Sequence, residues 1–236
     1  YIINNNIKKT QIQPSSVDLS LSNECYEIKY SFLSYNSKVR DKLKDLIIKR
    51  VDLSKGYTFK INKTYIVKLN ESLNLKKNIF GHCNPKSSTG RLDIFCRTIV
   101  DYAEEYEKIP KNYKGEIFLE ITSKSFNVIF QKNDMLNQLR LINKKHNYLT
   151  DRQIINFKKS QKIISLKNKI KIDNGIKLSV DLSQNKVIAY EAKKNAPILN
   201  FSKIGIYKIK DFWNPINNFN KKLFIEKNKF YILKSK

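Results

Sequence analysis

Lys86-Ser87-Ser88-Thr89-Gly90-Arg91 is the stretch around which the rest of the sequence is organised. It stands between an apolar pair, Ile79-Phe80, and residues 92–99, whose alternating side chains predict a β-strand. Backbone N–H groups and hydroxyls in such a stretch can bind phosphate oxygens, and its two cations can neutralise them. The spaced glycines of a P-loop are absent, and on its own the pattern also fits a polar loop between two strands.

A second stretch, Gly115-Glu116-Ile117-Phe118-Leu119-Glu120-Ile121-Thr122, predicts a strand. Its odd-numbered apolar residues point to one face, and the even-numbered residues 118, 120 and 122 point to the other. Glu120 is therefore a carboxylate in mid-strand beside an aromatic ring. Taken alone, such a glutamate is usually solvated, so its meaning depends on the motifs around it.

Together with Leu136-Asn137-Gln138-Leu139-Arg140, these stretches resemble the dCTP deaminase branch of the trimeric, dUTPase-like nucleotide hydrolases. In that family a Lys-Ser-Ser-x-Gly-Arg loop precedes a Gly-x-Ile-x-Leu-Glu-Leu/Ile strand and then a Gln-Leu strand. The order and approximate spacing hold here, apart from one expanded loop. Gln13-Pro14-Ser15-Ser16-Val17-Asp18-Leu19 resembles a further family motif, although Asp18 also fits a strand-edge residue bonded to backbone N–H groups.

Short strands with turn signals between them follow one another through the first 145 residues, a pattern typical of an all-β barrel or jelly roll. The resemblance implies a mainly β, dUTPase-like distorted jelly-roll or β-clip barrel with a few short helices. Helical spacing predicts an amphipathic helix over residues 38–49. A capping box that begins at Thr150 predicts a second short helix, which ends near residue 159.

An internal repeat occupies the C-terminal part. Residues 16–20, Ser-Val-Asp-Leu-Ser, recur at residues 179–183, and residues 59–67 have an echo at residues 224–233. Because the echoes keep their order and nearly their separation, this part resembles the start of a second copy, as in the double-length form of dCTP deaminase. We predict a catalytic β domain at residues 1–145, a helix and basic linker at 146–172, and a partial second repeat at 173–236.

The composition limits the classes of partner. The 236 residues carry a formal charge of +25, but lysines spread along the whole chain, so we interpret the charge as a solvated surface and expect no nucleic-acid partner. No apolar run reaches the ~20 residues that span a bilayer, and no signal-peptide pattern opens the chain. Three cysteines without a CxxC pair indicate a reducing cytoplasm.

The resemblance implies a role for each motif residue. Glu120 would act as general base on water and then as general acid toward the cytosine. Ser87, with a backbone carbonyl near Val100, would position the water, and Arg91 would pair with phosphate close to Glu120. The implied substrate-binding residues are Lys86, Ser88, Thr89, Gly90, Phe118, Leu119, Gln138 and Asp101.

We expect no zinc site, because the HxE and PCxxC motifs of zinc deaminases are absent, and His82 and His146 lack metal-ligand spacing. Mg²⁺ would arrive on the triphosphate of dCTP. The resemblance further implies a homotrimer with sites at subunit interfaces, dTTP as a candidate inhibitor, and dUTP supply toward dUMP and dTTP synthesis.

The sequence differs from the family pattern at the position that contacts the deoxyribose. Where the family has an aspartate under the deoxyribose, this chain has Pro110, which leaves Asp101 and Glu104 as substitutes. The family's C-terminal segment that closes over the nucleotide also has no clear match. Two other functions stay open: a dUTPase or a bifunctional deaminase and dUTPase on the same fold, and a non-catalytic basic β-barrel that binds nucleic acid.

Overall fold

A computed structural model of the protein describes residues 1–3, 7–143, 149–160, 171–183, 187–217, 220 and 222–235. The chain forms two compact units, residues 1–144 with 192–214 and residues 145–191 with 215–236. The predicted domain limits at residues 145 and 172 stay a prediction. Residues 146–148 and 161–170 of the predicted linker, His146 among them, lie outside the described part.

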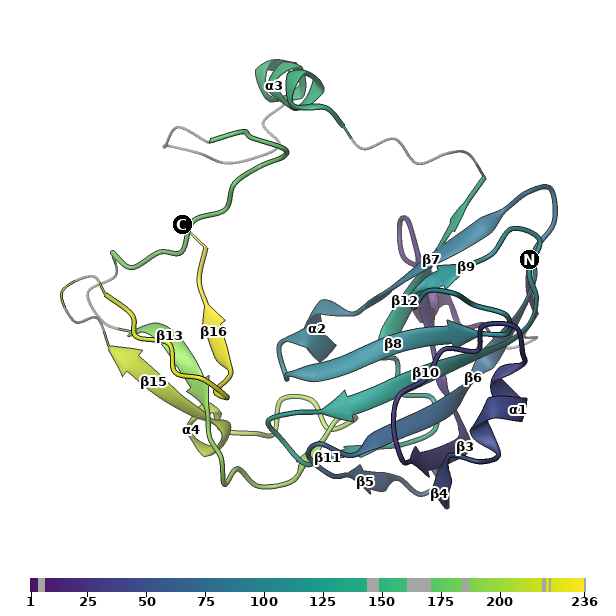
Figure 1. Ribbon diagram of the computed structural model, residues 1–236. Coiled ribbons are helices and arrows are strands. Elements are labelled where there is room, and N and C mark those ends of the chain that lie inside the picture. Colours follow the sequence, from purple (N-terminus) through teal and green to yellow (C-terminus); the bar gives the residue numbers. More distant parts are fainter. Residues whose placement is uncertain are drawn as a thin grey trace. The chain divides into compact units, whose positions relative to one another are not determined.

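The largest sheet of the first unit has the strand order β4-β3-β6-β10-β8 (Figure 1). The short strand β1 pairs with β6 in this sheet. All its described pairings are antiparallel, and β10 lies between β6 and β8. Its strands are β1 (Ile2–Ile3), β3 (Leu21–Ile28), β4 (Ile47–Asp52), β6 (Thr64–Asn74), β8 (Ile94–Val100) and β10 (Lys114–Ser123).

Two smaller sheets complete this unit. One has the order β2-β12-β7-β9 and the other β14-β11-β5, in which β14 runs parallel to β11. The first consists of β2 (Val17–Leu19), β7 (Phe80–Pro85), β9 (Lys108–Ile109) and β12 (Asn137–Ile142). The second consists of β5 (Tyr57–Phe59), β11 (Val128–Phe130) and β14 (Leu199–Asn200).

Both faces of the large sheet are covered by apolar side chains. Leu119 and Ile121 of β10 point into the main core, which also contains Leu139 of the second sheet. Phe118, which directly precedes Leu119 in sequence, belongs to a second cluster on the opposite face. The predicted alternation of this strand is therefore confirmed, and it places Glu120 on the same face as Phe118.

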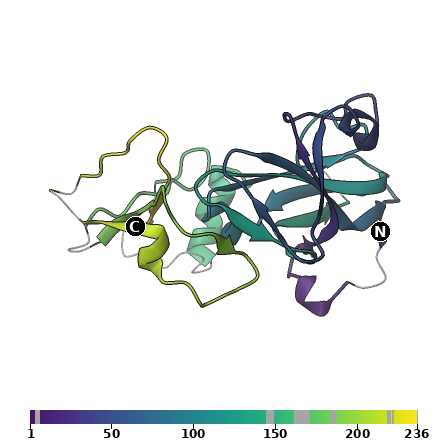
Figure 2. The ribbon, with the colours of Figure 1, turned by 90° about the horizontal axis from the view of Figure 1, so that it is seen from below.

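The cover over that opposite face comes from residues 29–46, which include α1 (Val39–Leu43). Val39 and Leu43 pack against the cluster around Phe118, and α1 lies outside the sheet in both ribbon views (Figure 1, Figure 2). The prediction of one helix over residues 38–49 was wrong, because α1 ends at Leu43 and β4 begins at Ile47. Pairing of β4 with β3 takes these residues into the sheet instead.

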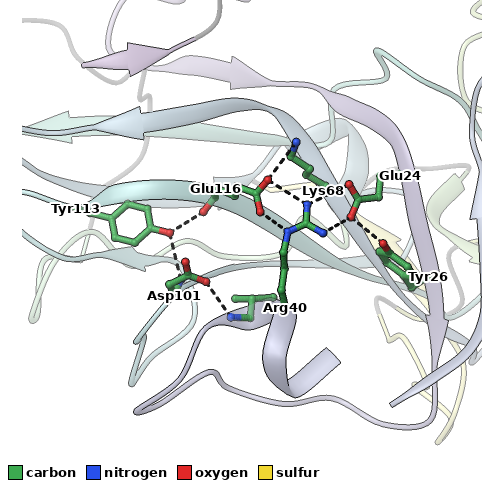
Figure 3. A network of polar contacts seen from close by, with 8 residues as sticks. Glu24, Tyr26, Arg40, Lys68, Asp101, Tyr113 and Glu116 are labelled. Carbon is green, nitrogen blue, oxygen red and sulfur yellow. Dashed lines mark hydrogen bonds and ion pairs between the residues drawn. The ribbon is translucent and has the colours of Figure 1, made fainter. Parts of the chain in front are cut away.

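A polar network fastens α1 to the sheet (Figure 3). The Arg40 guanidinium donates to both carboxylate oxygens of Glu116, at 2.6 and 3.0 Å, and to both oxygens of Glu24, at 2.8 and 3.1 Å. This contact with Arg40 lowers the pKa of the Glu116 carboxyl. The Asp101 carboxylate accepts the backbone N–H of Val39 at 2.9 Å and so caps the start of the helix.

The second unit holds the helix predicted from the capping box. Helix α3 (Asp151–Ser160) begins after Thr150. The backbone N–H of Thr150 donates to the Gln153 side chain at 2.8 Å, and the backbone N–H of Gln153 donates to the Thr150 hydroxyl at 3.4 Å. A sheet of order β15-β13-β16 follows, with β13 (Val187–Ala192), β15 (Trp213–Asn217) and β16 (Tyr231–Leu233). Most of its residues belong to the second unit, whereas Ala192, Trp213 and Asn214 belong to the first. The remaining short helices of the described chain are η1 (Lys9–Gln11), α2 (Ser87–Gly90) and α4 (Ile209–Phe212).

No helix of the described residues is long and apolar enough to cross a membrane. The protein is thus mainly β with a few short helices, as the sequence predicts.

Candidate active site

The polar stretch that organises the sequence folds as one turn of helix, α2, between β7 and β8. The backbone N–H of Lys86 donates to the Leu136 carbonyl at 2.8 Å, and the Thr89 hydroxyl donates to the same oxygen at 3.0 Å. Thr89 is fully buried, so its side chain anchors the turn to the start of β12. These contacts fix where the other side chains of the turn can point.

Lys86 forms an ion pair with Asp18, whose carboxylate is almost completely buried on β2. Gln138 of β12 lies opposite Asp18 in the sheet register and accepts a hydrogen bond from the Ser16 hydroxyl at 3.0 Å. Asp18 therefore binds a cationic side chain in place of backbone N–H groups. Three motifs that are far apart in sequence meet here, at residues 16–18, 86–91 and 136–140.

Some side chains of the turn face solvent, and others line a cavity. Ser87 and Arg91 are four residues apart and exposed, and neither side chain bonds to any other residue that the structure describes. Lys86 and Ser88 line a cavity of about 690 Å³. Its other walls are formed by Leu92, residues 131–135, residues 199–205 and Tyr207. The cavity is large enough for a nucleotide-sized ligand, and Lys86 offers it a cation.

Glu120 lies on β10 with its side chain only 3% exposed. Arg97, directly opposite on β8, donates from Nε to Glu120 Oε1 at 3.0 Å and from Nη2 to the same oxygen. The other oxygen, Oε2, is buried and receives no hydrogen bond from any described residue. A buried carboxylate with one oxygen held by a cation and one free acceptor is the arrangement that a general base needs.

Two protein-family models match this chain, one over each part of the sequence. The model of the 2'-deoxycytidine 5'-triphosphate deaminase N-terminal domain matches residues 2–145, and that of the C-terminal domain matches residues 150–236. The chain belongs to the dCTP deaminase family. The crystal structure of 2'-deoxycytidine 5'-triphosphate deaminase from Agrobacterium tumefaciens matches with a TM-score of 0.93 and 33% identity, over 99% of this chain and 69% of that one. No curated protein sequence matches.

Within one chain of this dCTP deaminase family member, the predicted site residues form two groups. Lys86, Ser88 and Gln138 gather around α2, whereas Glu120 and Phe118 share the outer face of β10. Among the described residues, no hydrogen bond or ion pair joins Glu120 to Ser87 or Arg91. The predicted proximity of Arg91 to Glu120 stays a prediction, and in the single chain Arg97 occupies the place next to this carboxylate.

The predicted base pocket involves Phe118 and Leu119, which lie inside β10 and pair there with β6 and β8. The pairing of β8 with β10 ends at Val100 and Ile117, and the Tyr113 hydroxyl joins the residues just beyond it, Asp101 and Glu116 (Figure 3). It accepts the Asp101 N–H at 3.2 Å and donates to the Glu116 carbonyl at 2.7 Å. The roles of Phe118 and Leu119 in binding the base stay predictions.

Asp101 and Glu104, the two candidates to replace the aspartate under the deoxyribose, differ in whether their carboxylates are already engaged. Asp101 is engaged as the cap of α1. Glu104 is exposed and lines a cavity of about 410 Å³ with Tyr102, His82 and Pro110. The Val100 carbonyl, which is predicted to help position water, already accepts a hydrogen bond from the Ser34 hydroxyl at 2.6 Å.

Sequence reasoning missed two features of the site. Arg97 is a lone cation within an alternating apolar strand, and that pattern could have marked it as functional. The cavity wall at residues 199–207 gave no such signal, because it depends on pairing of Leu199 with Val128. Among the described residues, no cluster of three or more His, Cys, Asp or Glu side chains is arranged to hold a metal ion.

Proposed function

We propose that the chain hydrolyses dCTP to dUTP and ammonia, with Glu120 as general base and then general acid. The observation that carries the proposal is the Glu120 carboxylate, which is buried and held by Arg97 at Oε1 while Oε2 accepts no hydrogen bond from the described residues. Membership of the dCTP deaminase family supports dCTP as the substrate.

The reaction needs a base and an acid at one place. As water attacks C4 of cytosine, Glu120 takes a proton from it and passes a proton to N3, which gives a tetrahedral intermediate. The C4–N bond then breaks, the amino group leaves as ammonia with a proton delivered through Glu120, and C4 keeps the oxygen as a carbonyl. One water is consumed, and one carboxylate performs each proton transfer in turn.

The phosphate end of dCTP would bind around α2. Lys86 and Ser88 line the 690 Å³ cavity, while Ser87 and Arg91 present a free hydroxyl and guanidinium on the adjoining exposed surface. A guanidinium and an ammonium give charge-assisted hydrogen bonds to phosphate oxygens. Mg²⁺ would arrive bound to the triphosphate, because that ion prefers phosphate oxygens and water to a protein cage.

Self-association would bring the two groups of residues together. Ser87 and Arg91 are exposed and have no bonding partner among the described residues, which supports their use by a neighbouring subunit. We propose a homotrimer in which α2 of one subunit faces Glu120 of the next. The product dUTP would supply dUMP and dTTP synthesis, with dTTP as the candidate inhibitor.

Two glutamates on the same strand face allow a matched test. Glu120→Gln keeps the volume of the side chain but removes the base, so we expect kcat for ammonia release to fall by about 10³-fold. Binding of dCTP, measured by calorimetry, should change little. Glu116→Gln, four positions earlier and paired with Arg40, should keep its kcat within about threefold. Full activity of Glu120→Gln would refute the mechanism.

A further inference from the structure

Arg97 makes an unusual contact with Glu120, because two of its three guanidinium nitrogens reach the same carboxylate oxygen. A guanidinium can grip both oxygens of a carboxylate in a fork. Here Nε and Nη2 bind Oε1 alone, which leaves Oε2 with no described donor. The contact therefore distinguishes the two oxygens of one carboxylate and fixes the rotation of the group about its last torsion.

The guanidinium is itself held in place by two further segments. It stacks over the ring of Tyr106, 4.0 Å from the ring centroid, and Nη2 donates to the Ser31 hydroxyl at 3.1 Å. The Tyr106 hydroxyl in turn donates to the Phe32 carbonyl at 3.1 Å. Burial raises the pKa of the Tyr106 hydroxyl, which favours the protonated form that donates this bond. The face of the ring carries the negative potential that attracts a cation.

We infer that Arg97 is a positioning residue for the deamination: it holds Oε1 of Glu120 so that Oε2 accepts the proton of the attacking water. The inference rests on the proposed function and adds a second residue to it. Because Arg97 comes from β8, Ser31 from the cover and Tyr106 from the loop after β8, the orientation of Glu120 depends on three parts of the first unit.

A lysine cannot reproduce this contact. Its ammonium is a point charge on a flexible stem, whereas the planar guanidinium stacks on Tyr106 and directs two N–H groups at once. We therefore expect Arg97→Lys to keep the charge beside Glu120 but to lose part of the orientation. Arg97→Gln should lose both.

Arg40 supplies the matched control. It too is an arginine on this face of the sheet that lies over an aromatic ring, in this case that of Phe118, 5.5 Å from the centroid. It too binds carboxylates, those of Glu24 and Glu116 (Figure 3). Its exposed side-chain fraction, 42%, is close to the 39% of Arg97. Arg40→Gln thus measures what loss of an arginine from this face does to the fold alone.

The experiment compares kcat and KM for ammonia release from dCTP in the full chain, together with the melting temperature of each variant. We expect Arg97→Gln to lower kcat about 100-fold and Arg97→Lys about 10-fold, with KM within about threefold of the wild type in both. Guanidinium ion should restore part of the activity of Arg97→Ala. Arg40→Gln should keep its kcat within about threefold even where its melting temperature falls.

The outcomes separate the two proposals. If Glu120→Gln is inactive while Arg97→Gln and Arg97→Lys keep the kcat of the wild type, the inference about Arg97 fails and the proposed function stands. Equal losses of kcat in Arg97→Gln and Arg40→Gln would also overturn it, since they would show a loosened fold only. A wild-type chain that releases no ammonia from dCTP would overturn both proposals.

Discussion

The ion pair between Lys86 and Asp18 predicts an asymmetry between its two single variants. The Asp18 side chain is 3% exposed and that of Lys86 is 28% exposed. Lys86→Met leaves a buried carboxylate without its cation, and we expect a loss of about 3 kcal/mol because water can reach the Lys86 side of the pair. Asp18→Asn leaves an ammonium that can turn toward solvent and costs only about 1 kcal/mol.

The double variant makes the argument quantitative. Lys86→Met/Asp18→Asn contains no uncompensated charge, so we expect it to lose only about 1 kcal/mol relative to the wild type. The coupling energy of the cycle is then about 3 kcal/mol, well above the few tenths expected for independent sites. The more exposed partner is therefore predicted to be the more costly one to remove.

Urea unfolding followed by the fluorescence of Trp213 is the assay. Trp213 is the one tryptophan of the sequence, and its ring lies 5.4 Å from that of Phe126 in the first unit, so it reports on the unit that contains the ion pair. Equal losses in the two single variants, or a double variant whose loss equals their sum, would refute the assignment of a buried charge to Asp18.

Two further predictions concern the core of the first unit. A Cβ at Gly81 would lie 2.8 Å from Leu139 Cδ1 and 3.1 Å from Ile109 Cβ, so Gly81→Ala should cost about 1–2 kcal/mol in the same assay, whereas Gly90→Ala, with nothing within 4 Å, should be nearly neutral. Burial raises the pKa of Glu107 above its ordinary value of 4.5, so the folded state loses stability as the pH rises past that value. Glu107→Gln should therefore match the stability of the wild type at pH 4 and exceed it at pH 8. A difference in stability that stays constant across that range would contradict the assignment.

Local patterns predicted much of the fold because they act within one element. The alternation around Glu120 follows from the two-residue period of a strand, and the main core and the Phe118 cluster take opposite faces of β10 as that period requires. Thr150 and Gln153 form the capping box that their spacing indicates. In both cases the contacts that decide the structure are made by neighbours in sequence.

Non-local contacts account for what the sequence did not predict. Val39, Leu43 and Leu46 have helical spacing, but Ile47 pairs with Ile28, so the chain leaves the helix to join the sheet. The contact between Arg97 and Glu120 depends on the register of β8 with β10, which no pattern within either strand sets. Likewise, the cavity wall at residues 199–207 depends on a parallel pairing across some 70 residues of chain.

Product analysis with purified chain, dCTP and Mg²⁺ tests the central claim most directly. Chromatography of the nucleotides and an enzymatic assay for ammonia should show dUTP and ammonia in equal amounts, with no pyrophosphate. Release of dUMP and pyrophosphate along with ammonia would show that the chain also cleaves the triphosphate. Hydrolysis of dUTP without any ammonia from dCTP would contradict the account, because Glu120 would then not be the base of a deaminase.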